Sequence, residues 1–345
     1  MQVMKILVTG GTGFIGSHTC VKLLEADHQV VIIDNLVNSK KENVAKIEAL
    51  GHKSLEFYEG DIRDAKKMNE VFESCAIDAV IHFAGLKAVG ESVSMPLEYY
   101  DNNVNGTIQL LKVMKKFNCK KIVFSSSATV YGMNENVPFK EDYPLSTTNP
   151  YGATKKIIEE ILHDLYVGDP EFSIALLRYF NPIGAHPSGL IGENPNGIPN
   201  NLLPYVAKVA SGELEQLSVF GDGYDSIDGT GVRDYIHVQD LAEGHIAALN
   251  YVQVQSGIEA FNLGTGKGYS VLQVVKAFEK ASGKTVKYHI VDRRPGDIAT
   301  CYASIQKSKN LLHWEAKLDL DTMCKDTWNY VQTEMTGLWL NDEKQ

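Results

Sequence analysis

The chain has 345 residues, of which 44% are hydrophobic and 22% are charged. These ordinary values exclude a disordered or fibrous protein. Its 33 Lys and Arg residues against 43 Asp and Glu residues give a net charge of −10, and a surface that acidic does not attract nucleic acid or an anionic membrane. No uncharged apolar stretch approaches the ~20 residues that span a bilayer, and the N-terminus lacks a signal-peptide layout. We therefore expect a cytoplasmic protein with neither nucleic acid nor membrane as partner.

The metal-binding and redox residue types are few and dispersed. Five cysteines are scattered without any Cys-x-x-Cys pair, which fits neither a disulfide framework nor a zinc cluster. His82 and His237 each lie in an apolar, strand-like run without metal-ligand spacing, so both are interpreted as core histidines. We expect no metal site.

The first half of the chain alternates short β-branched runs with helical patterns, which predicts βαβ units and a doubly wound parallel sheet. Several of the strands are almost wholly apolar, as expected when helices cover both faces of a sheet. The expected strands are residues 5–9, 29–34, 55–59, 79–84, 121–125 and 173–180, and the expected helices are residues 14–26, 65–74, 102–117 and 151–166.

The pattern changes after residue 180. Residues 181–204 contain five of the eleven prolines, and a long irregular segment inside a compact protein is usually a binding loop. Later elements predict a smaller, mixed α/β domain; they are strands at 218–220 and 260–263 and a helix at 271–281. We therefore expect a first domain at 1–180 and a second, substrate-binding domain at 181–345, with later segments able to return to the first.

A glycine-rich loop joins the first expected strand to the first expected helix. It fits Gly-x-Gly-x-x-Gly through Gly11, Gly13 and Gly16, and also Gly-x-x-Gly-x-x-Gly through Gly10. Glycines at these points permit a tight turn and let backbone N–H groups approach a pyrophosphate at the positive end of the helix. The loop is typical of a Rossmann-type, dinucleotide-binding domain.

The residues after the second strand favour NAD over NADP. Asp34 ends that strand eighteen residues beyond Gly16, where a carboxylate accepts hydrogen bonds from the adenosine ribose. The same charge would repel a 2′-phosphate, and Asn35 follows in place of the usual accommodating Arg. Lys40 and Lys41 would argue for NADP, but we interpret them as solvated loop charges.

Two further strand ends carry candidate cofactor contacts. Asp61 and Ile62 follow the third strand and could border the adenine. Residues 83–85 end the fourth strand at the carboxyl edge, where open α/β sheets bind ligands, and the small residues Ala84 and Gly85 would let a cofactor lie against the backbone. Lys87 lies just beyond, where it could meet a phosphate or ribose or remain a surface lysine.

The candidate catalytic residues follow the fifth strand, which runs into three serines at 125–127. Downstream, Tyr151 and Lys155 are i, i+4 neighbours on one face of a helix that begins near Pro150. A free tyrosine has a pKa near 10. The nearby ammonium, together with the positive charge of an oxidised nicotinamide, would favour the phenolate and lower that pKa. Tyr151 is thus the candidate base, and Ser127 could share the proton.

These residues carry a resemblance that extends over nearly the whole chain. The sequence resembles the extended short-chain dehydrogenase/reductase superfamily and, within it, the UDP-glucose 4-epimerase family. The Tyr-x-x-x-Lys pair is specific only to the superfamily, whereas the later stretches are more specific to the epimerases. The matching stretches are residues 82–92, 99–107, 177–182, 184–189, 197–202 and 228–238.

The resemblance implies an NAD-dependent isomerase of galactose metabolism that inverts C4 of UDP-glucose and UDP-galactose through a transient 4-keto sugar. Tyr151 would take the proton of the 4-hydroxyl, Ser127 would bond O4, and Lys155 would tune Tyr151 and hold the nicotinamide ribose. The implied cofactor contacts are Gly10, Gly13, Phe14, Ile15, Gly16, Asp34, Asn35, Asn38, Ser39, Asp61, Ile62, Phe83, Ala84, Gly85, Lys87, Asn102, Ser125, Tyr151, Lys155 and Phe180. The implied nucleotide-sugar contacts are Lys87, Ser127, Tyr151, Asn181, Asn201, Leu202, Phe220, Arg233, Arg294, Asp297 and Cys301.

Within the substrate set, two kinds of residue are distinctive. Arg233 and Arg294 are assigned to the diphosphate because a guanidinium fork matches phosphate oxygens, although either could be an ordinary ion-pair partner. Cys301 stands where some epimerases have a bulky tyrosine beside the sugar 2-substituent. The extra volume predicts that N-acetylated UDP-hexosamines also react, unless Cys301 is simply a buried thiol.

Two alternative functions are weighed against the epimerase, and the resemblance also bears on the oligomeric state. A nucleotide-sugar 4,6-dehydratase shares the fold but needs an Asp-Glu pair at the serine run, where this chain has Ser125-Ser126-Ser127-Ala128. A non-catalytic NAD-binding protein would be expected to lack the Tyr/Lys pair. The resemblance also implies a homodimer, formed through a four-helix bundle around 102–117 and 151–166.

Overall fold

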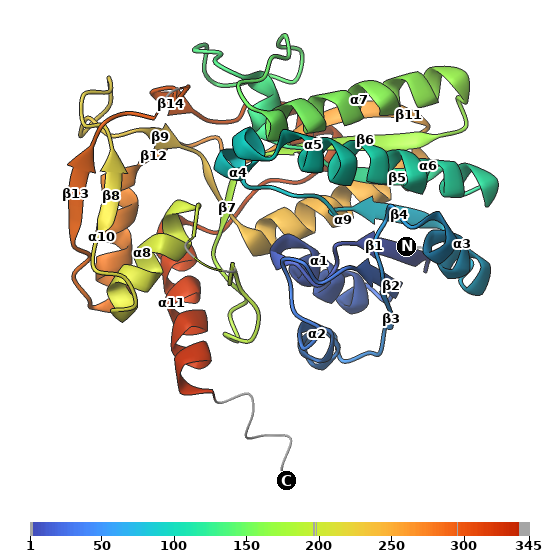
Figure 1. Cartoon of the computed structure of the whole chain (residues 1–345), viewed down its shortest axis with the longest axis horizontal. Helices are drawn as coiled ribbons and strands as arrows, with labels where there is room; N and C mark the ends of the chain where they lie inside the picture. The colour runs from blue at the N-terminus through green and yellow to red at the C-terminus, as the bar shows by residue number, and fades with distance from the viewer. Residues whose placement is uncertain (1–2, 196, 198, 295, 338–345) are drawn as a thin grey trace.

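The computed structural model describes residues 3–195, 197, 199–294 and 296–337. Ile198, within one of the stretches that carry the resemblance, lies outside the described residues. Two lobes are visible, a larger one around a central sheet and a smaller one beside it (Figure 1). Within the described residues, no helix is both long and apolar enough to cross a membrane.

The larger lobe contains a seven-stranded sheet in the order β11-β6-β5-β4-β1-β2-β3. Every neighbouring pair is parallel, so the predicted doubly wound α/β sheet is confirmed. The strands are β1 (Lys5–Thr9), β2 (Gln29–Asp34), β3 (Glu56–Glu59), β4 (Ala79–His82), β5 (Lys121–Ser125), β6 (Ser173–Tyr179) and β11 (Gly257–Leu263).

Helices cover both faces of the sheet, because successive strand residues point to opposite faces. Ile6 and Val8 of β1 lie in one core layer, and Leu7 lies in the other. Figure 1 shows α6 and α7 on one side of the sheet and α1 and α9 on the other. The first side is formed by α3 (Ala65–Ser74), α6 (Gly106–Lys116) and α7 (Pro150–Gly168), and the second by α1 (Phe14–Glu25), α2 (Asn43–Gly51) and α9 (Val238–Val254).

Helix starts follow local sequence signals. Asp64 caps α3 by accepting hydrogen bonds from the backbone N–H groups of Lys66 and Lys67. At α7, Asn149 accepts the N–H of Gly152 at 2.9 Å, and Pro150 occupies the first turn. These caps explain why Tyr151 and Lys155 lie in the first two turns of α7.

The predicted helix at 102–117 is helical from residue 102 to residue 116, but its first turn is π-helical rather than α-helical. Short helices α4 (Val89–Ser94) and α5 (Pro96–Tyr99) lead into a π-helical segment, η1 (Tyr100–Asn105), before α6 begins. The side chain of Asn103 bonds outside its own helix, to the backbone of Leu86 and to Thr154. A π-helical turn inside a helix often marks a functional site.

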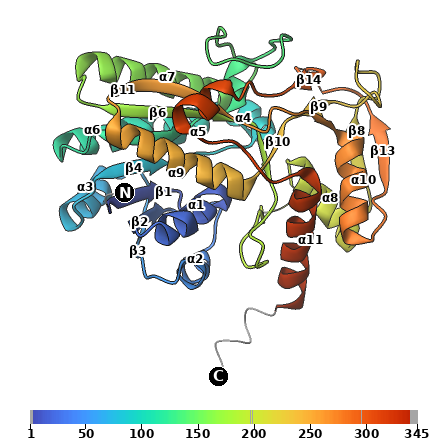
Figure 2. The ribbon, with the colours of Figure 1, turned by 180° about the vertical axis from the view of Figure 1, so that it is seen from behind.

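The smaller lobe has its own hydrophobic core, which includes Val206, Leu217, Phe278 and Met323. It is a mixed α/β unit, which Figure 2 shows from behind. Its elements are α8 (Leu202–Ser211), β8 (Leu217–Phe220), α10 (Val271–Ser282), β13 (Tyr288–Val291) and α11 (Leu320–Thr336). The short pieces between the lobes are β7 (Asn181–Ile183), β9 (Val232–Arg233), β10 (Tyr235–His237), β12 (Tyr269–Ser270) and β14 (Thr300–Cys301), with η2 (Ala128–Tyr131) and η3 (Ser308–Leu312) elsewhere.

The chain returns to the larger lobe after residue 181. Helix α9 packs beside α1, and β11 pairs with β6 along its whole length. The domain boundary after residue 180 remains a prediction, since these two segments belong to the larger lobe in space.

Candidate active site

The candidate cofactor residues gather at one edge of the central sheet. All seven strands are parallel, so their carboxyl ends meet at the same edge, where ligands bind in open α/β sheets. Loops after β1 to β5 bring five segments there. These segments are residues 10–16, 34–39, 61–62, 83–87 and 125–127.

The glycine loop leaves no room for side chains between β1 and β4. Gly10 has a φ of +70°, and a Cβ there would lie 2.9 Å from the backbone nitrogen of Ala84. A Cβ at Gly16 would lie 2.3 Å from the carbonyl oxygen of Gly10. Helix α1 begins directly after Gly13, with no side chain capping its first N–H groups. The bare backbone and free helix N-terminus fit a dinucleotide pyrophosphate, against which Phe14 and Ile15 would lie.

Asp34 is held rigidly beside this loop. It is 8% exposed and accepts hydrogen bonds from the backbone N–H groups of Thr12 and Leu36, at 3.1 and 2.9 Å. Ser39 donates to it at 3.0 Å. The neighbouring Asn38 is exposed. The carboxylate is therefore fixed beside the glycine loop, where the predicted contact with ribose hydroxyls would be made and where its charge would disfavour a 2′-phosphate.

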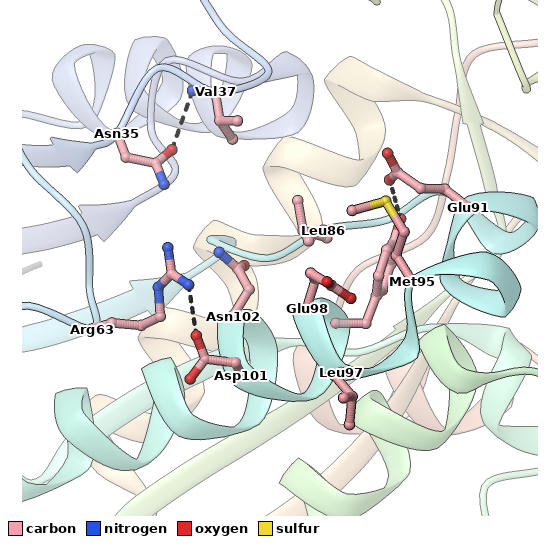
Figure 3. Close-up of a pocket in the computed structure, with 11 residues that line it drawn as sticks. Asn35, Val37, Arg63, Leu86, Glu91, Met95, Leu97, Glu98, Asp101 and Asn102 are labelled. Atoms are coloured by element: carbon pink, nitrogen blue, oxygen red, sulfur yellow. Dashed lines mark hydrogen bonds and ion pairs between the residues drawn. The ribbon is translucent and has the colours of Figure 1, made fainter.

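A cavity of about 510 Å³ lies next to this segment. Figure 3 shows Asn35 and Arg63 on one side of it and Met95 and Leu97 on the other, with Asn102 of η1 between them. Neither reactive side chain of α7 lines this cavity. It therefore matches the adenosine end of the candidate cofactor site rather than the reacting end.

A hydrogen bond and two ion pairs hold the side chains at the wall of this cavity in place. Asn35 donates to Asp61 at 2.9 Å, and Arg63 bonds both Asp61 and Asp101. The bonds from Arg63 hold the pKa of Asp61 down to about 2. Ile62 is 5% exposed and packs into the core under η1, so of this predicted pair Asp61 is the more accessible.

The candidate reacting groups meet where β5 ends. Tyr151 and Lys155 lie on the buried face of α7, 6% and 4% exposed. The Lys155 Nζ donates to the backbone oxygen of Ser125 at 2.7 Å and lies 6.0 Å from the ring centre of Tyr151. Ser127 caps η2 and is hydrogen-bonded to Tyr151. The structure thus brings all three predicted catalytic residues together.

The expected lowering of the Tyr151 pKa combines the Lys155 ammonium with the charge of an oxidised nicotinamide, and it stays a prediction. Burial raises the pKa of Tyr151 to about 12, and the hydrogen bond with Ser127 opposes this only in part. Burial also lowers the pKa of Lys155 to about 8, against the attraction of Glu159. In the protein chain alone, burial thus favours the neutral phenol, and the positive charge of an oxidised nicotinamide would favour the phenolate.

Lys87 and Asn201 share a partner that the sequence analysis did not predict. Glu193 accepts hydrogen bonds from Lys87 at 2.9 Å and from Asn201 at 2.8 Å, both through Oε1. Its side chain is 8% exposed. The carboxylate therefore links the loop after β4 to the start of α8 in the smaller lobe.

The predicted diphosphate residues form a second cluster. Arg294 bonds Asp297 at 2.9 Å and lies 4.8 Å above the ring of Phe220. Arg233 of β9 reaches the other oxygen of Asp297 at 3.5 Å. Both arginines are ion-paired and also partly exposed. Each can therefore be an ion-pair partner within the protein and still be accessible to a diphosphate.

The remaining predicted substrate residues lie in different surroundings. Cys301 stands opposite Arg233 in the β9–β14 pair and packs against the cluster that contains Phe180. Burial raises the pKa of its thiol to about 12, so it is an inert small side chain. Asn181 is exposed in β7, whereas Leu202 packs on the core of the smaller lobe.

Asn103 is a second residue that the sequence analysis missed. It is 1% exposed and exchanges two hydrogen bonds with the backbone of Leu86 while donating to Thr154 at 3.0 Å. It therefore ties the loop after β4 to α7. A polar residue on the inward face of a predicted helix is the signal that could have found it, whereas Glu193 lies in an irregular loop without one.

The two core histidines have local partners. His82 lies between the hydroxyls of Thr9 and Thr107, at 2.7 and 2.9 Å. His237 accepts a backbone bond from Gln239 and lies 3.2 Å from Asp326. Across the residues that the structure describes, no group of three His, Cys, Asp or Glu side chains is arranged to hold a metal ion.

Comparison with known proteins agrees with this arrangement. The family model described as GDP-mannose 4,6 dehydratase matches residues 7–327. UDP-glucose 4-epimerase of Bacillus subtilis is 60% identical over 334 residues, which cover 97% of this chain and 98% of that protein.

Solved structures give the same result. UDP-glucose 4-epimerase from Bifidobacterium longum, in complex with NAD+ and UDP, superposes with a TM-score of 0.93 at 54% identity and covers 96% of this chain and 99% of its own. The UDP-Glc/GlcNAc 4-epimerase of Campylobacter jejuni gives 0.85 at 36% identity, covering 96% and 99%.

The glycine loop, the buried Tyr/Lys pair and the separate small lobe define an extended short-chain dehydrogenase/reductase. The relatives narrow the class further. The chain belongs to the family of the matching model and, within it, to the UDP-glucose 4-epimerases.

Proposed function

We propose that this protein interconverts UDP-glucose and UDP-galactose by inverting C4 through a transient 4-keto sugar, with NAD as its cofactor. The observation that carries the proposal is the buried trio of Ser127, Tyr151 and Lys155 beside a dinucleotide-type glycine loop. The epimerase relatives, one of them solved with NAD+ and UDP, support the same activity.

In this mechanism Tyr151 takes the proton of the sugar 4-hydroxyl, with Ser127 hydrogen-bonded to the same oxygen. Bound NAD supplies the hydride acceptor and, after the sugar has turned, the hydride donor. Loss of a proton and a hydride converts the carbinol at C4 to a ketone, and their return to the opposite face inverts C4. Lys155 stabilises the phenolate by its charge and is fixed to the carbonyl of Ser125.

Turning the 4-keto ring requires that the nucleotide be held more firmly than the sugar. Arg233 and Arg294 suit a diphosphate by charge and fork geometry, and Phe220 offers an apolar surface beside them. An uncharged hexose lacks a comparable anchor. We propose that these residues keep UDP in place while the sugar rotates.

A coupled assay tests the activity. Purified protein supplied with UDP-galactose is expected to form UDP-glucose, detected with a UDP-glucose dehydrogenase that reduces added NAD. No net oxidation of the UDP-sugars should occur without the coupling enzyme. A UV-absorbing 4-keto-6-deoxy product would instead favour the dehydratase. The serine run is held as Ser125–Ser127 with Ala128 beginning η2, without the carboxylates that dehydration needs. Absence of both products would favour a non-catalytic NAD-binding protein.

The side chain at position 301 is expected to control the use of N-acetylated sugars. Cys301→Tyr should lower the activity on UDP-GalNAc at least tenfold relative to UDP-galactose, because the phenol fills the space beside the 2-substituent. Cys324→Ser, at a buried thiol in the smaller-lobe core, controls for general destabilisation. An unchanged ratio of the two activities would contradict this size selection.

We also propose a cytoplasmic homodimer that pairs through α6 and α7. Val93 and Leu97, on the short helices packed against α7, are 63% and 77% exposed, which is costly for apolar side chains in water. Free cysteines throughout the described residues suit the cytoplasm.

Light scattering tests the dimer. The wild-type protein should show twice the mass of one chain, and Val93→Glu should shift it toward one chain at low concentration. Val254→Glu, at another exposed valine at the end of α9, should leave the dimer intact. A monomeric wild type would refute this assembly.

A further inference from the structure

A buried ion pair lies directly beneath the candidate reacting groups. Glu159 and Arg178 have side chains that are 4% and 6% exposed. The Arg178 Nη2 donates to Glu159 at 2.7 Å, and its Nε lies 3.1 and 3.2 Å from the two carboxylate oxygens. Ser126 also donates to this carboxylate. Glu159 therefore joins α7, β6 and the serine run at a single point.

The arginine extends the contacts to the other side of the serine run. Its Nη1 donates to the hydroxyl of Tyr131 at 3.2 Å and to the carbonyl of Glu141 at 2.9 Å. Tyr131, the last residue of η2, donates in turn to Asn262 of β11 at 2.7 Å. The turn that contains Ser127 is thus held from both ends, at Ser126 and at Tyr131.

Glu159 is also placed to act on Lys155. It lies one helical turn further along α7, and its charge attracts the Lys155 ammonium. The groups that face Lys155 come from three elements: Tyr151 and Glu159 on α7, His82 on β4, and the ring of Phe124 and the carbonyl of Ser125 on β5.

Stability alone is a poor explanation for these contacts. Moving two charges out of water costs about as much as their attraction returns, and apolar residues of similar volume often serve a core equally well. This ion pair instead contacts both ends of the active-site turn. It thereby provides hydrogen bonds of fixed direction and a fixed charge, which apolar residues cannot provide.

We propose that Glu159 and Arg178 are positioning residues of the epimerase site: their contacts with Ser126, Tyr131 and α7 set Ser127 and Tyr151 relative to each other, and the Glu159 carboxylate lies one helical turn from the Lys155 ammonium. The proposal rests on the function proposed above. Neither residue contacts the substrate. Each acts through the serine run and α7.

The test compares Glu159→Gln with Glu160→Gln on the holoenzyme. Glu160 lies next in sequence but is exposed and pairs with Lys156 on the surface. Glu159→Gln keeps the shape and loses the charge, so kcat is expected to fall about tenfold to a hundredfold, the scale of a slightly misplaced catalytic group. The KM for UDP-galactose should remain within about twofold, because neither Glu159 nor Arg178 belongs to the proposed nucleotide contacts Arg233, Arg294 and Phe220.

The pH profile separates positioning from a merely structural role. An opposite charge raises the pKa of an ammonium, so without it Lys155 loses its proton at lower pH. The alkaline limb of kcat for Glu159→Gln should therefore move down by about one pH unit, while that of Glu160→Gln stays with wild type. Ser126→Ala, which removes one contact and no charge, should lower kcat without moving the limb and remains informative if Glu159→Gln fails to fold.

Two outcomes overturn the proposal while the wild type is active: Glu159→Gln matching Glu160→Gln in kcat and pH profile, or Ser126→Ala matching wild type in kcat. An inactive wild type in the same assay would instead refute the proposed function.

Discussion

Replacing Tyr151 by Phe should reduce kcat for UDP-galactose by about 10²- to 10⁴-fold, the range for loss of a positioned general base. The buried ring keeps its packing in this variant, and only the hydroxyl bonded to Ser127 is lost. The KM should change little, because the phenol is required for the proton transfer rather than for holding UDP. Activity is measured in the coupled assay at saturating UDP-galactose.

The same variant carries a pH signature. Below its working pKa the phenol is protonated and cannot accept the 4-hydroxyl proton, so wild-type kcat should fall as the pH decreases. Residual activity of Tyr151→Phe should lack that acid limb. Tyr166→Phe, on the same helix, is the matched control and should behave as wild type. Retention of more than a tenth of the activity by Tyr151→Phe would remove Tyr151 from the base role.

The pKa finding shows what sequence spacing leaves out. The i, i+4 spacing correctly predicts that Tyr151 and Lys155 share one face of α7. It says nothing about how deeply that face is buried, and burial raises one pKa to about 12 while lowering the other to about 8. The electrostatics of the pair therefore depend on tertiary packing and on the cofactor charge, neither of which is local.

The fold was largely predictable because its signals are local. Strands at 5–9, 29–34 and 121–125 match the structure residue for residue, since apolar β-branched runs end at glycine or polar residues there. The π-helical first turn of the helix at 102–117 was not predicted, and Asn103 in that turn bonds to Leu86 and Thr154, partners distant in sequence. Helix α2 was missed altogether.

The site residues that the sequence analysis did not predict were missed for the same reason, because their partners lie far away in the sequence. Glu193 can be recognised as a site residue only from its hydrogen bonds with Lys87, more than a hundred residues earlier, and with Asn201. In the sequence, Glu159 is one of three acidic residues on an amphipathic helix, and only the fold brings Arg178 of β6 against it. Motifs reveal groups that contact ligands, whereas supporting groups are defined by pairs that only the folded chain brings together.

Replacing Lys155 by Met should lower kcat about 10²- to 10³-fold, the cost of removing one preorganised charge from a buried site. The variant loses both the cation beside Tyr151 and the hydrogen bond to Ser125, leaving that carbonyl without this donor. We also expect weaker retention of NAD, measured as cofactor bound per chain after gel filtration. Arg should restore little activity, because a planar guanidinium cannot take the place of a compact ammonium in this packed site.

The pH dependence of wild-type kcat should reveal the titration of Lys155. With the pKa of Lys155 lowered to about 8, the ammonium is present at pH 7 and is lost as the pH rises, so kcat should fall on the alkaline side. Lys156→Met removes the next, surface-exposed lysine and should preserve both the rate and this limb. If Lys155→Met kept the same alkaline limb as wild type, the titrating group would be a different one, and the phenolate would need another source of stabilising charge.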